Sequence, residues 1–114
     1  MAYTRLNPAS GNPTQEQLGI TVTNKNGFTV TLSNFHVYGK IVHATISINP
    51  GSAVSPTIGR VNPCTITGFE ECLNPVVGER YHGVLNSVGN VWIHPTTDLS
   101  ANTSYDGVVT ALLP

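Results

Sequence analysis

Histidine is the residue type in this chain best suited to chemistry, because imidazole binds metals and transfers protons near neutral pH. The four histidines are His36, His43, His82 and His94, each in a separate part of the sequence. No pair has the close spacing of a preformed zinc site, and only six carboxylates are present to complement them. The sequence therefore predicts no metal site.

The carboxylates and cysteines form no recognisable catalytic motif. Glycoside hydrolysis needs two carboxyl groups held across a cleft. The adjacent pair Glu70-Glu71 would point to opposite sides of a strand, or into solvent from a loop. A Gly-x-Ser-x-Gly sequence, which would hold a serine nucleophile, does not occur. These observations predict that the chain is not an enzyme and needs no cofactor.

The two cysteines, Cys64 and Cys72, are close enough in sequence for a disulfide to close the loop between them. The N-terminus does not show the charged and then apolar order of a signal peptide, so we expect cytosolic synthesis. Cytosolic thiols stay reduced. We therefore expect two reduced, partly buried thiols, with a disulfide as the alternative.

Trp92 and His94 form the combination best suited to ligand binding. On a strand they share one face, while Val91 and Ile93 face the other way and fill the core. The C–H face of a sugar can stack on an exposed indole while its hydroxyls bond to polar groups nearby. This pair predicts a saccharide site.

Three more side chains are expected to complete this site: Arg80 and His82 on a neighbouring strand, and Asp98 in the following loop. Arginine and aspartate together could hold vicinal hydroxyls or a phosphate. Two alternatives remain open. Trp92 could instead anchor the core or a subunit interface, and recognition could use the loop tips at 49–56 and 95–102.

The composition is that of a folded domain with few charges. The chain has 114 residues, of which 39% are hydrophobic and 10% charged, with a formal net charge of −1. The five basic residues are scattered singly, so they form no stripe that would bind a phosphate backbone. No apolar run approaches the roughly 18 residues of a membrane span. Binding to nucleic acid and insertion into a membrane are therefore not expected.

Alternating apolar residues predict β-strands along most of the chain. Residues 18–23 and 28–32 alternate on either side of an Asn/Gly turn at 24–27, which predicts a β-hairpin. Residues 35–48 are predicted to form one long strand, bent by a bulge near Gly39-Lys40. That strand would place His36 with Tyr38, and His43 on the other side with Phe35 and Ile41. Further strands are expected at 57–61, 64–67, 80–86, 90–94 and 104–113.

Seven or eight short strands with frequent turn signals and no helix predict an all-β fold, an antiparallel β-sandwich or jelly-roll-like knob. Residues 1–17 are rich in Asn, Pro, Gly and Gln, and we expect them to be a leader or linker. Residues 18–114 are then expected to form a single domain.

Four parts of the sequence together carry a family resemblance. They are the segment Gly19–Leu32, the strand around Tyr38-Gly-Lys-Ile-Val42, the proline-bounded middle and the ending from Asn74 onward. That ending includes Pro75-Val-Val-Gly-Glu-Arg-Tyr-His82 and Asn86-Ser-Val-Gly-Asn-Val-Trp-Ile-His-Pro95. Across residues 18–114 the chain resembles the receptor-binding or tail-fibre head domains of tailed bacteriophages.

This resemblance implies a β-sandwich head that forms a homotrimer and binds bacterial surface polysaccharide or a teichoic-acid-like polymer. It also implies location in the phage tail of the virion after assembly in the host cytoplasm, with other tail or baseplate proteins as partners. Residues 80, 82, 92, 94 and 98 have the types that line such clefts. The long neck that usually precedes these heads has no counterpart in residues 1–17.

Two other functions remain open. The chain could be a structural tail, baseplate or capsid-decoration protein with Trp92 at a subunit interface and no small ligand. It could also be a monomeric carbohydrate-binding module appended to a secreted enzyme.

Overall fold

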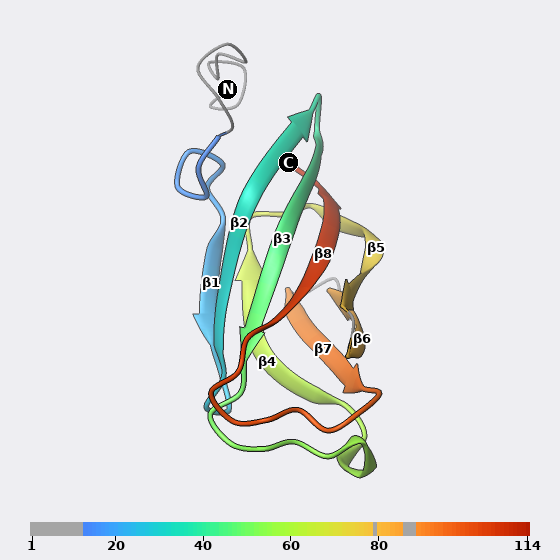
Figure 1. Cartoon of the computed structure of the whole chain (residues 1–114). Helices are drawn as coiled ribbons and strands as arrows, with labels where there is room; N and C mark the ends of the chain where they lie inside the picture. Colours follow the sequence, from blue (N-terminus) through green and yellow to red (C-terminus); the bar gives the residue numbers. More distant parts are fainter. Residues whose placement is uncertain (1–12, 79, 86–88) are drawn as a thin grey trace.

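The computed structural model describes residues 13–78, 80–85 and 89–114, with side chains described for all of these except 72–77, 84 and 85. Within these ranges the chain forms eight strands and one short 3-10 turn, which confirms the all-β prediction (Figure 1). The strands are β1 (Thr21–Asn24), β2 (Thr29–Tyr38), β3 (Ile41–Asn49), β4 (Val61–Thr67), β5 (Glu71–Gly78), β6 (Tyr81–Leu85), β7 (Asn90–Pro95) and β8 (Tyr105–Leu112). The 3-10 turn, η3, spans Pro56–Ile58.

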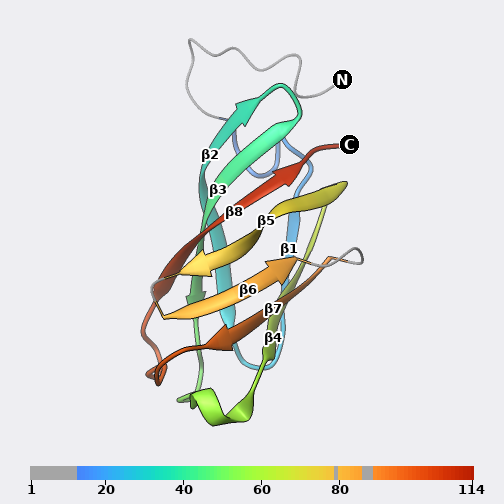
Figure 2. The same ribbon diagram turned by 90° about the vertical axis from the view of Figure 1, so that its right-hand side faces the viewer.

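The strands pair in the order β1-β4-β7-β6-β5-β8-β3-β2, and every pair is antiparallel. Figure 2 shows much of this ladder, running from β2 and β3 through β8, β5 and β6 to β7. The ladder curves over so that β1 and β4, at one end of it, lie against β2 at the other, as in a β-sandwich. We divide the ladder midway, with β1, β4, β7 and β6 on one side and β2, β3, β8 and β5 on the other. We call these the first layer and the second layer.

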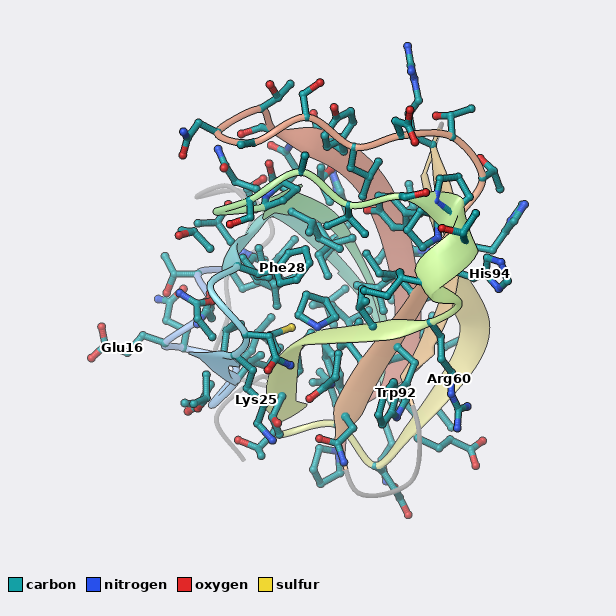
Figure 3. The ribbon with its side chains drawn as sticks, turned by 90° about the horizontal axis from the view of Figure 1, so that it is seen from below. Glu16, Lys25, Phe28, Arg60, Trp92 and His94 are labelled. Atoms are coloured by element: carbon teal, nitrogen blue, oxygen red, sulfur yellow. The ribbon has the colours of Figure 1, made fainter. Side chains whose placement is uncertain are left out.

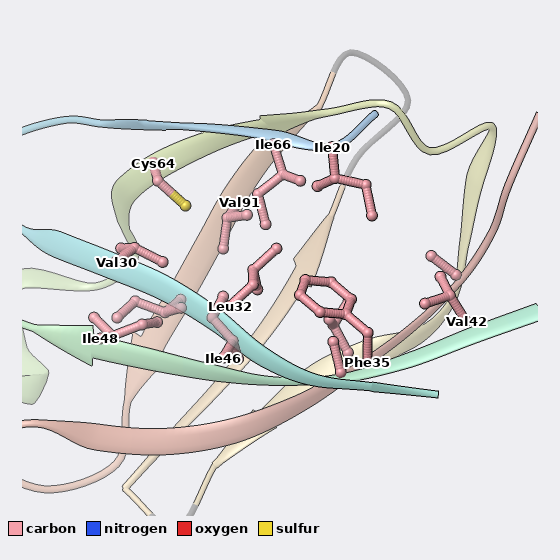
Figure 4. Packing of buried hydrophobic residues seen from close by; sticks show 14 of the residues in the cluster. Ile20, Val30, Leu32, Phe35, Val42, Ile46, Ile48, Cys64, Ile66 and Val91 are labelled. Atoms are coloured by element: carbon pink, nitrogen blue, oxygen red, sulfur yellow. The ribbon is translucent and has the colours of Figure 1, made fainter. Parts of the chain in front are cut away.

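The core lies between the two layers and is built mainly from aliphatic side chains (Figure 4). Alternation along β3 is regular, with Val42, Ala44, Ile46 and Ile48 all buried. The first layer contributes residues such as Ile66 and other side chains of β4 and β7 from the opposite side. The period-two pattern thus places these side chains as the sequence predicts.

The predicted hairpin between residues 18–23 and 28–32 is wrong in its pairing, although its turn is present. Asn26 and Gly27 both have positive φ, and Phe28 N–H donates to Lys25 O at 3.0 Å. However, β1 pairs with β4 and β2 pairs with β3. The turn therefore leads from one layer to the other, and it is closed by the Asn24 side chain, which accepts the Val30 N–H at 2.9 Å.

The predicted long strand at 35–48 is also wrong, because Gly39 and Lys40 form a tight turn between two strands. Tyr38 pairs with Ile41, and Gly39 has φ 64°, as in a two-residue hairpin with glycine at its first position. The change of apolar phase in the sequence therefore marks a reversal of the chain. As a consequence, His43 lies opposite His36 and shares its face, contrary to expectation.

The middle of the chain differs from the prediction in two further places. The strand expected at 57–61 is instead η3, with Ser55 capping it by accepting the Thr57 N–H, and β4 begins only at Val61. The strand β5 was missed, because Pro75 lies within it. Residues 1–12 of the expected leader and residue 86 of the predicted strand 80–86 lie outside the described residues. No helix in the described ranges is long and apolar enough to cross a membrane.

Candidate binding pocket beside Trp92

Trp92 lies on the outer face of the first layer, as the alternation predicts. Val91 and Ile93 are fully buried, whereas Trp92 is half-buried and His94 exposed. On β6, Tyr81 is fully buried and His82 exposed. The prediction that Trp92 and His94 share one face of their strand, with Val91 and Ile93 on the other, is therefore confirmed.

The five predicted site residues lie along this face without converging on one point. His82 pairs directly with His94, while Trp92 is in register with Val84, two positions further along. Arg80 precedes β6 and bonds through Nη1 to Thr97 Oγ1 at 3.4 Å. Four residues of strand separate its register from that of Trp92, about 13 Å at the usual rise. Asp98 is exposed in the loop that follows β7.

A bulge in β4 lies opposite Trp92. Val61 pairs with Ile93 and Cys64 with Val91, so that Asn62 and Pro63 together oppose Trp92 alone. Proline has no N–H to donate to the ladder, which favours an interruption at this point. Bulges of this kind often redirect a side chain next to a functional site.

The buried amide of Asn62 stabilises the bulge. Its Nδ2 donates to Cys64 O at 3.0 Å and to Val91 O at 2.5 Å. The main-chain carbonyl of Asn62 accepts a hydrogen bond from Asn26 Nδ2 at 2.8 Å, and that of Pro63 accepts one from the Lys25 N–H at 2.9 Å. The turn after β1 is thereby held against the bulge.

Arg60 is the cation that contacts Trp92. Its Cζ lies 4.7 Å from the centre of the indole ring, a cation–π distance. Figure 3 shows the two side chains next to each other and apart from His94. Arg60 stands immediately before Val61, so it comes from the strand on the opposite side of β7 from Arg80.

Trp92 and Arg60 form one wall of a pocket of about 520 Å³. The remaining lining comes from Asn26, Phe28, residues 51–54, Ile58 and residues 61–62. Phe28 is buried, whereas Ile58 is 63% exposed at the rim. The lining is mainly apolar with a few polar groups, which is usual for a small-molecule site.

The loop at 51–54 is held in place by the loop that follows β7. Val54 and Leu99 exchange two backbone hydrogen bonds of 2.9 and 2.8 Å, and Asn102 N–H donates to Pro50 O at 2.8 Å. Gly51 packs so closely on the turn that an added Cβ would lie 2.6 Å from Gly27 O. The face of Trp92 and one of the two predicted loop tips therefore meet at the same pocket.

Two titratable side chains are buried in the first layer, Cys64 on β4 and Tyr81 on β6. Cys64 is a free, buried thiol, so the alternative of a disulfide to Cys72 is wrong. Burial raises the pKa of Cys64 to about 12, opposed in part by the positive charge of Lys25. Burial also raises the pKa of Tyr81, with a further contribution from Asp106, and its hydroxyl has no hydrogen-bond partner among the described residues.

The sequence did not identify Arg60 or the loop at 51–54 as parts of this site. Arg60 becomes a neighbour of Trp92 only because β4 pairs with β7, and no local pattern specifies that pairing. The one available signal was Asn62-Pro63, because a proline inside a strand indicates a bulge or an edge.

Comparison with known proteins adds no assignment. No protein-family model matches the chain, and no curated protein or solved structure is significantly similar to it. Among the described residues, no three His, Cys, Asp or Glu side chains come together in a group that could hold a metal ion.

Proposed function

We propose that this chain is a non-catalytic recognition domain that binds a saccharide in the pocket beside Trp92. The observation that carries this proposal is the position of the single tryptophan. It lines a pocket of about 520 Å³ together with a guanidinium group, on the outer face of a sandwich layer.

The chemistry of the lining suits a sugar better than a purely apolar ligand. Trp92 and Phe28 offer apolar surface to C–H groups, while Arg60 and Ser52 offer hydrogen-bonding groups to hydroxyls. Arg60 covers one side of the indole, so the ligand is expected to contact the remaining ring surface and the guanidinium N–H groups. Guanidinium groups bind carboxylates and phosphates in a bidentate manner, which favours an anionic glycan such as a uronate or teichoic-acid-like polymer.

The resemblance in sequence gives this binding a biological setting. We propose a receptor-binding domain of a bacteriophage tail that recognises saccharide on a bacterial surface, forms a homotrimer with a jelly-roll-like head and assembles in the host cytoplasm. Three copies would convert weak binding at each pocket into firm adsorption, because the later contacts become intramolecular. Light scattering on the purified chain tests the trimer directly.

A second candidate is a structural tail, baseplate or capsid-decoration protein whose pocket is filled by another protein chain. The observation that favours it is Ile58, a large apolar residue 63% exposed at the pocket rim. In that case the trimer is expected with Trp92 protected from acrylamide quenching and with no saccharide bound.

The proposal is tested by binding to immobilised bacterial surface polysaccharides and wall teichoic acids. We expect Trp92→Ala to lose at least tenfold in affinity, since it removes the indole wall of the pocket. His82→Gln serves as the matched control: it lies exposed on the same face but outside the lining, and its affinity should stay within twofold. Circular dichroism checks that both variants fold. Equal binding by folded Trp92→Ala and the wild type would contradict the proposal.

A further inference from the structure

The four histidines of the chain lie in two cross-strand pairs. His36 is the register partner of His43 between β2 and β3, and His82 is that of His94 between β6 and β7. Directly opposed residues of an antiparallel pair point to the same face, with Cβ atoms about 4.5–5.5 Å apart. Each pair therefore brings two histidines to one face of neighbouring strands, although they are apart in the sequence.

In the first of these pairs, one ring is held in place by its neighbours. His43 Nδ1 lies 2.8 Å from Thr110 Oγ1, and Thr110 is its register partner on β8. The ring of Tyr38 packs edge-on against His43, with centroids 6.0 Å apart and planes at 67°. When Nδ1–H donates to Thr110, the lone pair of His43 lies on Nε2. A hydrogen bond of this kind commonly orients a metal-binding imidazole.

We infer that His36 and His43 form a binding site for a divalent transition-metal ion, with water completing the coordination. Imidazole is a preferred ligand of Zn²⁺, Cu²⁺ and Ni²⁺. Nitrogen atoms bound to one zinc ion at 2.0–2.1 Å can be no more than about 4 Å apart, which a cross-strand pair can satisfy. The site joins the two strands next to the turn at Gly39-Lys40, and it does not depend on the saccharide pocket.

The charges around the two pairs favour His36–His43. The guanidinium of Arg60 lies over Trp92, which shares the outer face of β7 with His94. Arg80 precedes His82 by two residues, so the two side chains point to the same face. The second pair thus has two guanidinium groups on its face, and these repel a cation.

Near His36 and His43 the nearby charges are mixed. Ile41 pairs with Leu112 and Leu112 with Glu71, which places this carboxylate on the same outer face, two strand spacings or about 10 Å from Ile41, the residue two positions before His43. Lys40 in the adjacent turn is the nearest cation in the sequence. The field at this pair is therefore less repulsive to a metal ion than the field at the other.

The test is a titration of the full chain with Ni²⁺ at pH 7.5, because Ni²⁺ is paramagnetic and does not oxidise thiols. Calorimetry should show one bound ion per chain. Nuclear magnetic resonance should show broadening centred on residues 36 and 43 and the adjacent part of β8. His36→Gln should weaken binding at least tenfold, and since His36 is exposed, this variant is expected to keep the fold.

The matched control is the double variant H82Q/H94Q, whose Ni²⁺ affinity should stay within twofold of the wild type. Ni²⁺ should also raise the melting temperature of the wild type but not that of His36→Gln, since a ligand that binds only the folded state stabilises it. Broadening centred on His82 and His94, or an unchanged affinity in folded His36→Gln, would overturn the inference.

Discussion

The two layers of the sandwich differ in the polar side chains that they bury, although the second layer also has one, Thr110 on β8. The first layer places polar side chains in its interior, among them the Asn62 amide, the Cys64 thiol and the Tyr81 hydroxyl. The strands β2 and β3 of the second layer turn only apolar side chains inward, from Val30 to Ile48. The pocket lies on the first layer, at the bulge of β4. One departure from regular pairing, the bulge of β4, thus coincides with the candidate site. Other register shifts lie in the second layer, between Ser33 and His36 and along β5.

The largest effect that we expect is a loss of stability in alkaline solution, caused by a buried thiol of the first layer. Because the pKa of Cys64 is raised in the folded state, the folded chain retains a proton that the unfolded chain loses above its ordinary value of 9.0. Stability from this group is complete below pH 9 and is lost as the pH rises toward 12, by about 1.4 kcal/mol per pH unit. Tyr81 adds a loss of the same sign above its ordinary value of 10.0.

Urea unfolding between pH 8 and pH 11 measures this effect. Cys64→Ala should flatten the decline of unfolding free energy with pH. Val109→Ala, a truncation in the second layer, should lower stability by a similar amount at every pH. Equal pH slopes for the wild type and Cys64→Ala would contradict the assignment of this loss to the buried thiol.

A smaller change should damage the pocket selectively. Gly51→Ala places a Cβ against Gly27 O and should push the loop at 51–54 away from the turn. We expect a loss of about 1–2 kcal/mol in stability, in the ordinary range for a local steric clash, and at least a tenfold loss of saccharide affinity. Ni²⁺ binding on the second layer should stay within twofold. Ser52→Ala changes the same loop without a clash and is the control for stability, which it should leave unchanged. Equal saccharide binding by Gly51→Ala and wild type would argue against this pocket.

The smallest effect is expected at Tyr81. Its buried hydroxyl has no partner among the described residues, and an unsatisfied buried hydroxyl costs about 1–3 kcal/mol. Tyr81→Phe should therefore raise the unfolding free energy by about 1 kcal/mol, with saccharide binding unchanged. Thermal unfolding measures the gain. A clear loss of stability would show that the hydroxyl is bonded.

Local patterns predicted what depends on neighbours in sequence. Alternation placed Trp92 and His94 on one side of a strand and Val91 and Ile93 on the other, and it identified most strands. Asn-Gly at 26–27 correctly marked a turn. In each case the required information lies within a few residues.

What the sequence did not predict depends on pairing between distant strands. The same Asn-Gly turn could join two paired strands or lead from layer to layer, and contacts of the Lys25 and Asn26 turn with β4 decide the outcome. A bulge and a tight turn both shift the apolar phase, so the pattern around Gly39-Lys40 does not distinguish one from the other. His36 meets His43 because β2 pairs with β3, and Arg60 contacts Trp92 because β4 pairs with β7. Register over long sequence separations is set by the whole core and has no short sequence signal.

The most direct test of the central claim is a titration of the wild-type chain followed by the fluorescence of Trp92, the single tryptophan. The titrant is the polysaccharide or teichoic acid that binds most tightly in the immobilised assay, with acrylamide quenching measured at each step. If the ligand occupies the pocket, emission should change saturably and quenching should fall in parallel with binding. Saturable binding measured by calorimetry with unchanged Trp92 emission and quenching would contradict the assignment of the pocket.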